Sequence, residues 1–144
     1  MDKIKATLPG NLPLRIRRFA ISLTIIACGL VLRLTGYEIG LPYFFVKYGG
    51  SLLWGMMVFW LLAMLLPSLS IWRVAALALV VAALTEFSRL YHTPWLDSFR
   101  LTFAGALLLG RIFSWGNILA YSLGIIVAAV VETRLLASRL GTRP

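Results

Sequence analysis

Four long apolar segments constrain the fold of this chain more than any other feature. They occupy residues 19–34, 50–66, 72–91 and 117–136. Their lengths approach the roughly 20 apolar residues that a helix needs to cross a bilayer. Only 13% of the residues are charged and 60% are hydrophobic, a balance that soluble domains do not have. We therefore predict an all-α, polytopic membrane helical bundle with four transmembrane helices.

Basic residues frame the apolar region at both ends of the chain. Residues 1–18 form a flexible basic segment, and residues 138–144 form a basic tail. The first apolar segment is longer than the hydrophobic region of a usual signal peptide and has no A-x-A-like cleavage site, so we expect it to stay as a signal-anchor helix. We predict one transmembrane domain over residues 19–137, between two cytoplasmic segments.

A further apolar run over residues 101–113 is too short to cross the membrane. At about 1.5 Å of rise per residue it gives about 20 Å of helix, against a hydrocarbon core of roughly 30 Å. We therefore predict one short re-entrant helix, which leaves both termini on the same side of the membrane.

The distribution of Lys and Arg agrees with this topology. Cytoplasmic loops carry an excess of these residues. With four crossings, nine lie on the side of the termini: Lys3, Lys5, Arg15, Arg17, Arg18, Arg73, Arg134, Arg139 and Arg143. Five lie on the opposite side: Arg33, Lys47, Arg89, Arg100 and Arg111. A full crossing by residues 101–113 would give seven on each side, so we predict that both termini are cytoplasmic.

Two stripes of small and polar residues predict how the third and fourth spans pack. Spacings of three and four residues place side chains on one helix face. On the third span this face carries Ala75, Leu79, Ala82, Glu86 and Arg89. On the fourth it carries Asn117, Tyr121, Gly124 and Ala128, and the last two form a small-xxx-small pair. We expect the two faces to pack together and to bring their polar ends into contact.

The polar ends of these stripes define the candidate functional site. A charged side chain within a membrane segment is costly unless it is paired or reaches water, so it marks a functional hypothesis. The loop after the third span adds further charged and aromatic residues. We predict one ligand-binding cluster at the outer face, formed by Glu86, Arg89, Asp97, Arg100, Trp115, Asn117 and Tyr121.

Each of these residues also has a structural interpretation. Glu86 and Arg89 lie three residues apart, so they can neutralise each other one turn from the interface. Asp97 can favour the N-terminus of the short helix, and Trp115 can anchor the chain at headgroup level. His92 is the single histidine and has no cysteine near it, so the sequence predicts no metal site and no cofactor.

The same region resembles a known protein family. Residues 86–100 read E-x-x-x-L-Y-H-x-P-W-L-D-x-x-R, and residues 105–110 read G-x-L-L-L-G. F-S-W follows at residues 113–115, with A-Y-x-x-G at residues 120–124. These motifs resemble the bacterial domain of unknown function 2809 family. The resemblance implies a small multi-pass protein of the bacterial inner membrane.

That family in turn resembles the VanZ-like membrane proteins, which are linked with glycopeptide (teicoplanin) resistance and the cell envelope. The present chain departs from the pattern of the 2809 family at Ser51, Arg89 and Asn117, where that pattern has Asp, Gln and Asp. Each departure removes an acid or adds a base. A transfer of acid-dependent chemistry to this chain is therefore not expected.

The basic residues of the outer side suggest a class of ligand. Arg89, Arg100 and Arg111 favour an anionic partner, because guanidinium groups match phosphate oxygens in bidentate geometry. Nucleic acid is not expected, because Lys and Arg lie at helix ends and form no patch with exposed aromatics. The leading hypothesis is an outer-face pocket that binds an anionic envelope lipid or a lipid-linked precursor.

Two alternatives from other functional classes stay open. One is a non-catalytic membrane scaffold that uses its small-residue stripes to bind a larger membrane protein or a second copy of itself. The other is an intramembrane hydrolase that uses Glu86. Serine contexts typical of hydrolases and phosphate-binding loops are absent from the sequence, so the sequence itself does not decide whether the protein is an enzyme.

Overall fold

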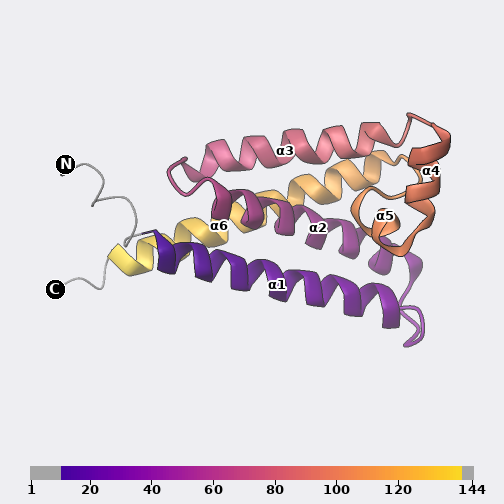
Figure 1. The fold of residues 1–144 in the computed structure, drawn as a ribbon. Coiled ribbons are helices and arrows are strands. Elements are labelled where there is room, and N and C mark those ends of the chain that lie inside the picture. Colours follow the sequence, from indigo (N-terminus) through magenta and orange to yellow (C-terminus); the bar gives the residue numbers. More distant parts are fainter. Residues whose placement is uncertain (1–10, 141–144) are drawn as a thin grey trace.

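The computed structural model describes residues 11–140, and the regular structure of this part of the chain is entirely helical. Four long helices run side by side along the molecule, and two short helices lie together at one end of it (Figure 1). The elements are α1 (Leu12–Thr35), α2 (Tyr43–Leu65), α3 (Ile71–Ser88), α4 (Pro94–Leu101), α5 (Phe103–Leu108) and α6 (Trp115–Leu140). The predicted all-α polytopic bundle is confirmed.

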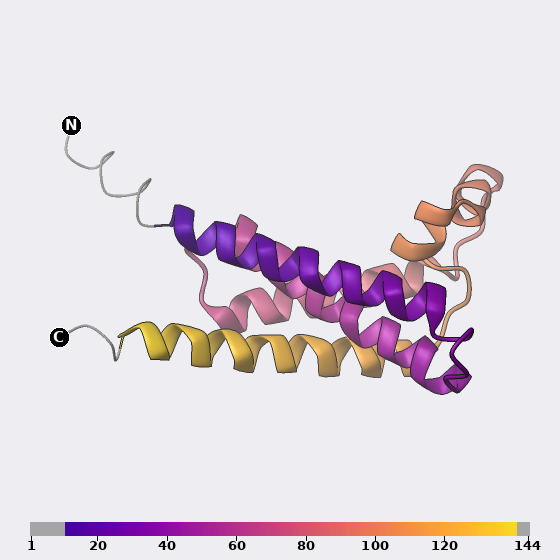
Figure 2. The same cartoon turned by 90° about the horizontal axis from the view of Figure 1, so that it is seen from below.

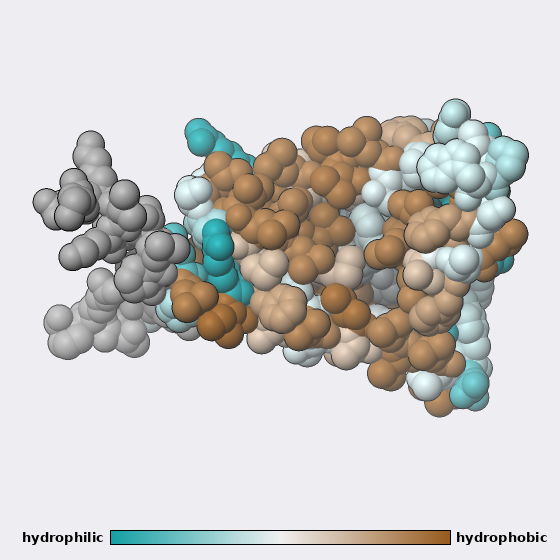
Figure 3. Space-filling view, in the orientation of Figure 1, coloured by the Kyte–Doolittle hydropathy of each residue, from teal (hydrophilic) through white to brown (hydrophobic). Residues whose placement is uncertain are grey.

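The long helices α1, α2, α3 and α6 are each long and apolar enough to cross a membrane. Apolar side chains cover the middle of the bundle, and polar side chains gather toward its ends (Figure 3). α5 has six residues and rises only about 9 Å, so it cannot cross. We call the end that carries α4 and α5 the hairpin end, and the end where α1 begins and α6 finishes the terminal end.

Several helix boundaries differ from the sequence prediction. α1 begins at Leu12 instead of residue 19, because Pro13 lies in the first turn, where its missing N–H costs no hydrogen bond. Arg15, Arg17 and Arg18 are therefore helical and not part of a flexible lead. Likewise α2 begins at Tyr43, directly after Pro42, instead of at residue 50.

The short apolar run also differs from its prediction as one helix over residues 101–113. α4 ends at Leu101, and Thr102 begins α5 by accepting a hydrogen bond from the Gly105 backbone N–H at 3.0 Å. Residues 109–114 then form an irregular connection to α6. We call residues 94–112 the hairpin, and Figure 2 shows it projecting from one side of the bundle, away from α6.

α2 is the central helix of the bundle. It packs against α1, α3 and α6. The backbone of α1 runs close to that of α2 alone among the described helices, and α1 reaches α6 through the side chains of Arg17 and Arg18. The core between these helices is formed by Phe59, Trp60, Ala78, Ile125 and Ala128, all of them almost fully buried.

Glycines bring α2 and α6 unusually close together. A Cβ atom at Gly124 would collide with the backbone of Leu52, and one at Gly55 would lie 2.5 Å from the carbonyl oxygen of Tyr121. The expectation that Gly124 faces the third span is therefore wrong, because this glycine packs on α2. Ala128 and Tyr121 are buried in the bundle as expected.

The predicted stripe on α3 is correct except at one position. Ala75, Ala82 and Glu86 are buried, but Leu79 is 37% exposed and Ala78 takes its place in the core. α3 packs against both α2 and α6. Ala75, Ala78 and Ala82 form its buried face, and the larger Leu79 lies at the edge of that face.

Candidate functional site

Glu86 is the centre of a buried polar network at the hairpin end. Its side chain is fully buried and lies on the last turn of α3. The carboxylate pairs with the guanidinium of Arg89 at 2.7 Å and accepts the backbone N–H of Ser114 at 2.7 Å. It also accepts the amide of Asn117 and the hydroxyl of Tyr121, each at 3.1 Å. We call Glu86, Arg89, Asn117 and Tyr121 the Glu86 network.

Arg89 connects this network to the chain that follows α5. Its guanidinium donates to the carbonyl oxygens of Leu109 at 2.6 Å and Ile112 at 3.2 Å, and to the Tyr121 hydroxyl at 2.8 Å. Gly110 has a φ of +70° and packs directly on this guanidinium, where a Cβ atom would lie 2.6 Å from its carbon. A residue with a side chain would therefore be strained here and would displace Arg89.

The network also reaches α2. The Ser51 hydroxyl donates to the Asn117 side-chain oxygen at 3.1 Å, and the rings of Trp54 and Tyr121 pack with centroids 4.9 Å apart. Ser51, Arg89 and Asn117, at which the chain departs from the expected family pattern, thus belong to one connected set of side chains. Hydrogen bonds and the ion pair satisfy the side chains of Ser51, Arg89 and Asn117 within the described residues, as buried polar groups require. The buried Trp54 Nε1 beside them has no hydrogen-bond partner there.

Arg100 and Asp97 form a second group on α4. Arg100 is 3% exposed. It donates to the carbonyl oxygen of Ser88, the last residue of α3, and to that of Tyr91, which lies just beyond the helix. It also pairs with Asp97 at 3.1 Å, and Asp97 lies 3.2 Å from the His92 ring nitrogen. Arg100 therefore fixes α4 against the end of α3, in the way that basic residues satisfy C-terminal carbonyls.

The predicted seven-residue cluster is thus divided in the structure. Glu86, Arg89, Asn117 and Tyr121 converge as the sequence suggested, but residues 11–140 show no hydrogen bond between them and the Asp97–Arg100 pair. Trp115 is 67% exposed and packs edge-on against the aromatic rings of Phe113 and Phe87. It has no hydrogen bond to either group among the described residues.

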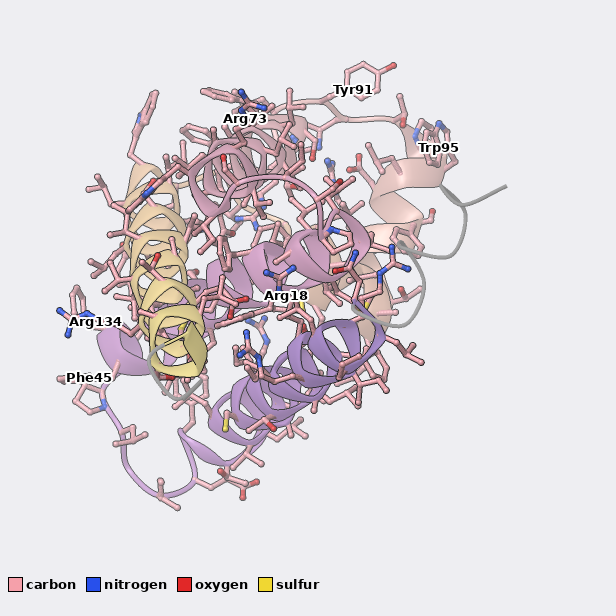
Figure 4. All side chains as sticks on the ribbon, turned by 90° about the vertical axis from the view of Figure 1, so that its left-hand side faces the viewer. Arg18, Phe45, Arg73, Tyr91, Trp95 and Arg134 are labelled. Carbon is pink, nitrogen blue, oxygen red and sulfur yellow. The ribbon has the colours of Figure 1, made fainter. Side chains whose placement is uncertain are left out.

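A second buried ionic cluster, at the terminal end, was not predicted. Glu132 on α6 is fully buried and pairs with Arg17 and Arg18 of α1, each at 2.7 Å. Arg18 also donates to the carbonyl oxygen of Ala63 on α2. Figure 4 shows Arg18 inside the bundle, whereas Arg73 and Arg134 point outward from it.

The sequence did carry a signal for this cluster. Glu132 is the single acid of the fourth span, and Arg17 and Arg18 adjoin the first span. Their pairing was missed because the arginines were assigned to a flexible segment. Lys3, Lys5 and Arg143, which were counted for topology, lie outside the described residues, as does the side chain of Arg139.

Among residues 11–140, no three His, Cys, Asp or Glu side chains gather closely enough to hold a metal ion.

A comparison with known protein families bears on the same region. The family model described as "Protein of unknown function (DUF2809)" matches residues 40–125, more than half of the chain. The chain belongs to this family. The part shared with DUF2809 extends from just before α2 into α6, so it includes the Glu86 network and the hairpin, and it leaves out Arg17, Arg18 and Glu132. No solved structure matches this DUF2809 protein.

Proposed function

We propose that the hairpin of this membrane protein binds an anionic headgroup at the outer face, with Arg111 as the binding cation. The charge balance of the hairpin end supports this proposal. Glu86 pairs with Arg89, and Asp97 pairs with Arg100. Arg111 is exposed and has no acidic partner among residues 11–140. This uncompensated cation is the single observation that carries the proposal.

The geometry of Arg111 suits the recognition of a phosphate group. Its Nε donates to the carbonyl oxygen of Arg100 and its Nη2 to that of Leu101, both at 3.2 Å. These contacts orient the guanidinium, which has five N–H donors in a planar fork. The remaining donors are available for a bidentate contact with an anion.

The surroundings of Arg111 fit a membrane boundary. Arg111 donates to Leu101, which is 67% exposed, and precedes Ile112, which is 79% exposed. Apolar side chains beside a cation are typical of positions where side chains meet both headgroups and acyl chains. We therefore expect the ligand to be an anionic envelope lipid or lipid-linked precursor. Such a ligand lies in the cell envelope, with which the VanZ-like proteins are linked.

Arg89 and Arg100 have a supporting role in this proposal. Both donate to backbone carbonyls and to an acid, and both are almost fully buried. They hold the two ends of the hairpin against α3 and so fix the position of Arg111. The Glu86 network then acts as the rigid base of the binding element.

The alternatives receive less support from the geometry. A general base must lie within hydrogen-bond reach of the proton that it abstracts, whereas Glu86 is fully buried and bonded to four other residues. A scaffold that uses the small-residue stripes would need them exposed, but Ala82, Gly124 and Ala128 are buried within the bundle.

Lipid that copurifies with the protein in mild detergent tests the proposal. Wild type, Arg111→Ala and Arg33→Ala are compared by mass spectrometry of the bound anionic lipids. Arg33 is an exposed arginine at the same end of the bundle, on the last turn of α1. We expect Arg111→Ala to lose an anionic lipid that Arg33→Ala retains. Equal amounts in wild type and Arg111→Ala, or equal losses in both variants, would contradict the proposal.

A further inference from the structure

A second surface with a cation beside apolar side chains lies at the terminal end, on the opposite side of the membrane from the hairpin. A groove of about 250 Å³ separates the start of α1 from the end of α2. It is lined by Arg15, Ile16, Phe19, Met64 and Leu65. One cation thus adjoins four apolar side chains at the level where a membrane helix meets the headgroups.

Arg15 is free to contact an external anion. Its side chain is exposed and has no hydrogen bond or ion pair with any residue in the described range 11–140. The buried acid of this end, Glu132 on α6, already pairs with Arg17 and Arg18. The first turn of α1 contains no acidic residue, and the Asn11 side chain makes no capping hydrogen bond. The positive end of the helix dipole therefore adds to the charge of Arg15.

The charge of the whole terminal end favours an anion as well. Among residues 11–138, whose side chains are described, five arginines lie there, Arg15, Arg17, Arg18, Arg73 and Arg134, against the single acid Glu132. The excess is four positive charges. At the hairpin end, five basic residues face the three acids Glu38, Glu86 and Asp97, and the excess is only two. Anionic lipids are attracted to clustered basic residues that lie next to membrane helices.

We infer that this groove binds one anionic phospholipid of the leaflet at the terminal end. Arg15 contacts the headgroup phosphate in this arrangement. Phe19, Met64 and Leu65 hold the first part of an acyl chain against α1 and α2. The arrangement accounts for a partnerless cation and an open apolar groove at the same place. It shares no residue with the hairpin site and does not depend on the function proposed for Arg111.

Native mass spectrometry of the full chain from detergent, titrated with phosphatidylglycerol or phosphatidylcholine, tests this inference. Every sample carries Arg111→Ala, so the hairpin contributes no anionic lipid and the two proposals are tested independently. In this background we compare Arg15→Ala with Arg134→Ala. Arg134 is an exposed arginine of the same end that points away from the bundle (Figure 4), so it controls for the general loss of one positive charge.

We expect Arg15→Ala to retain phosphatidylglycerol about fivefold more weakly, with no change for phosphatidylcholine. Arg134→Ala is expected to match its parent. Met64→Trp fills the groove without changing any charge, and it should also weaken phosphatidylglycerol retention. Equal losses from Arg15→Ala and Arg134→Ala would show diffuse attraction and overturn the inference. Unchanged retention in a folded Met64→Trp would show that the groove holds no lipid.

Discussion

The ion pair at the centre of the Glu86 network gives a quantitative prediction about stability. In Glu86→Gln, the Arg89 guanidinium stays in the bundle and keeps only neutral acceptors, namely the carbonyls of Leu109 and Ile112 and the Tyr121 hydroxyl. Removal of one member of a buried pair costs about 3 to 5 kcal/mol. Because the neutral acceptors remain, we expect a loss near the lower limit, about 3 kcal/mol.

The reverse change should cost less, for a chemical reason. In Arg89→Met, Glu86 keeps the Ser114 N–H, the Asn117 amide and the Tyr121 hydroxyl. The carboxylate thus keeps three hydrogen-bond donors, whereas the guanidinium in Glu86→Gln loses its charged partner. We expect a loss of about 2 kcal/mol. The double variant leaves no charge within the Glu86 network, so its loss should not exceed that of Glu86→Gln alone, and the coupling energy should be about 2 kcal/mol.

Reversible unfolding in mixed detergent micelles measures all four proteins of this double-mutant cycle. A coupling of this size changes the unfolding equilibrium constant roughly 30-fold. Glu38→Gln, the same substitution at an exposed acid of the same end, serves as the control and should change stability by less than about 0.5 kcal/mol. Strictly additive losses from the two single variants would refute the reasoning, because they would show that the charges do not compensate each other.

Two further predictions concern packing and topology. Gly124→Ala should destabilise the bundle by about 1 to 3 kcal/mol, because the added methyl group forces α2 away from α6. Gly50→Ala is its matched control, since a Cβ atom at Gly50 meets nothing within 4 Å, and a melting temperature lowered equally in both variants would argue against the close crossing. Two reporter proteins are fused after Pro144, one active only in the cytoplasm and one active only in the periplasm. We expect the cytoplasmic reporter to be active, and activity of the periplasmic reporter would show that the C-terminus lies on the opposite side.

The sequence alone determined the class of the fold and the members of the main polar network. The length and hydropathy of the apolar runs predict membrane helices because the bilayer itself sets both requirements. Helical spacing placed Glu86 beside Arg89, and the same spacing placed Asn117 on one face with Tyr121. Their convergence follows because polar groups in an apolar environment are stable only when they meet.

Tertiary structure alone decided which arginine remains available. Arg89, Arg100 and Arg111 look alike in the sequence, but the first two are buried against carbonyl groups and only the third is exposed. This difference depends on the break between α4 and α5 at Thr102, where the chain turns back. Arg89 then meets the carbonyls of Leu109 and Ile112, and Arg100 meets those of Ser88 and Tyr91. Helical periodicity describes neighbours along one helix and carries no information about such contacts.

The same reason explains why the pairing of Glu132 was missed and why Gly124 was assigned to the wrong neighbour. Glu132 meets Arg17 and Arg18 across more than a hundred residues of sequence, and Gly124 packs on α2 although α3 has a matching face. A small-residue stripe shows that a helix has a close neighbour but does not identify it. Only the packing of α1, α3 and α6 around α2 makes that choice.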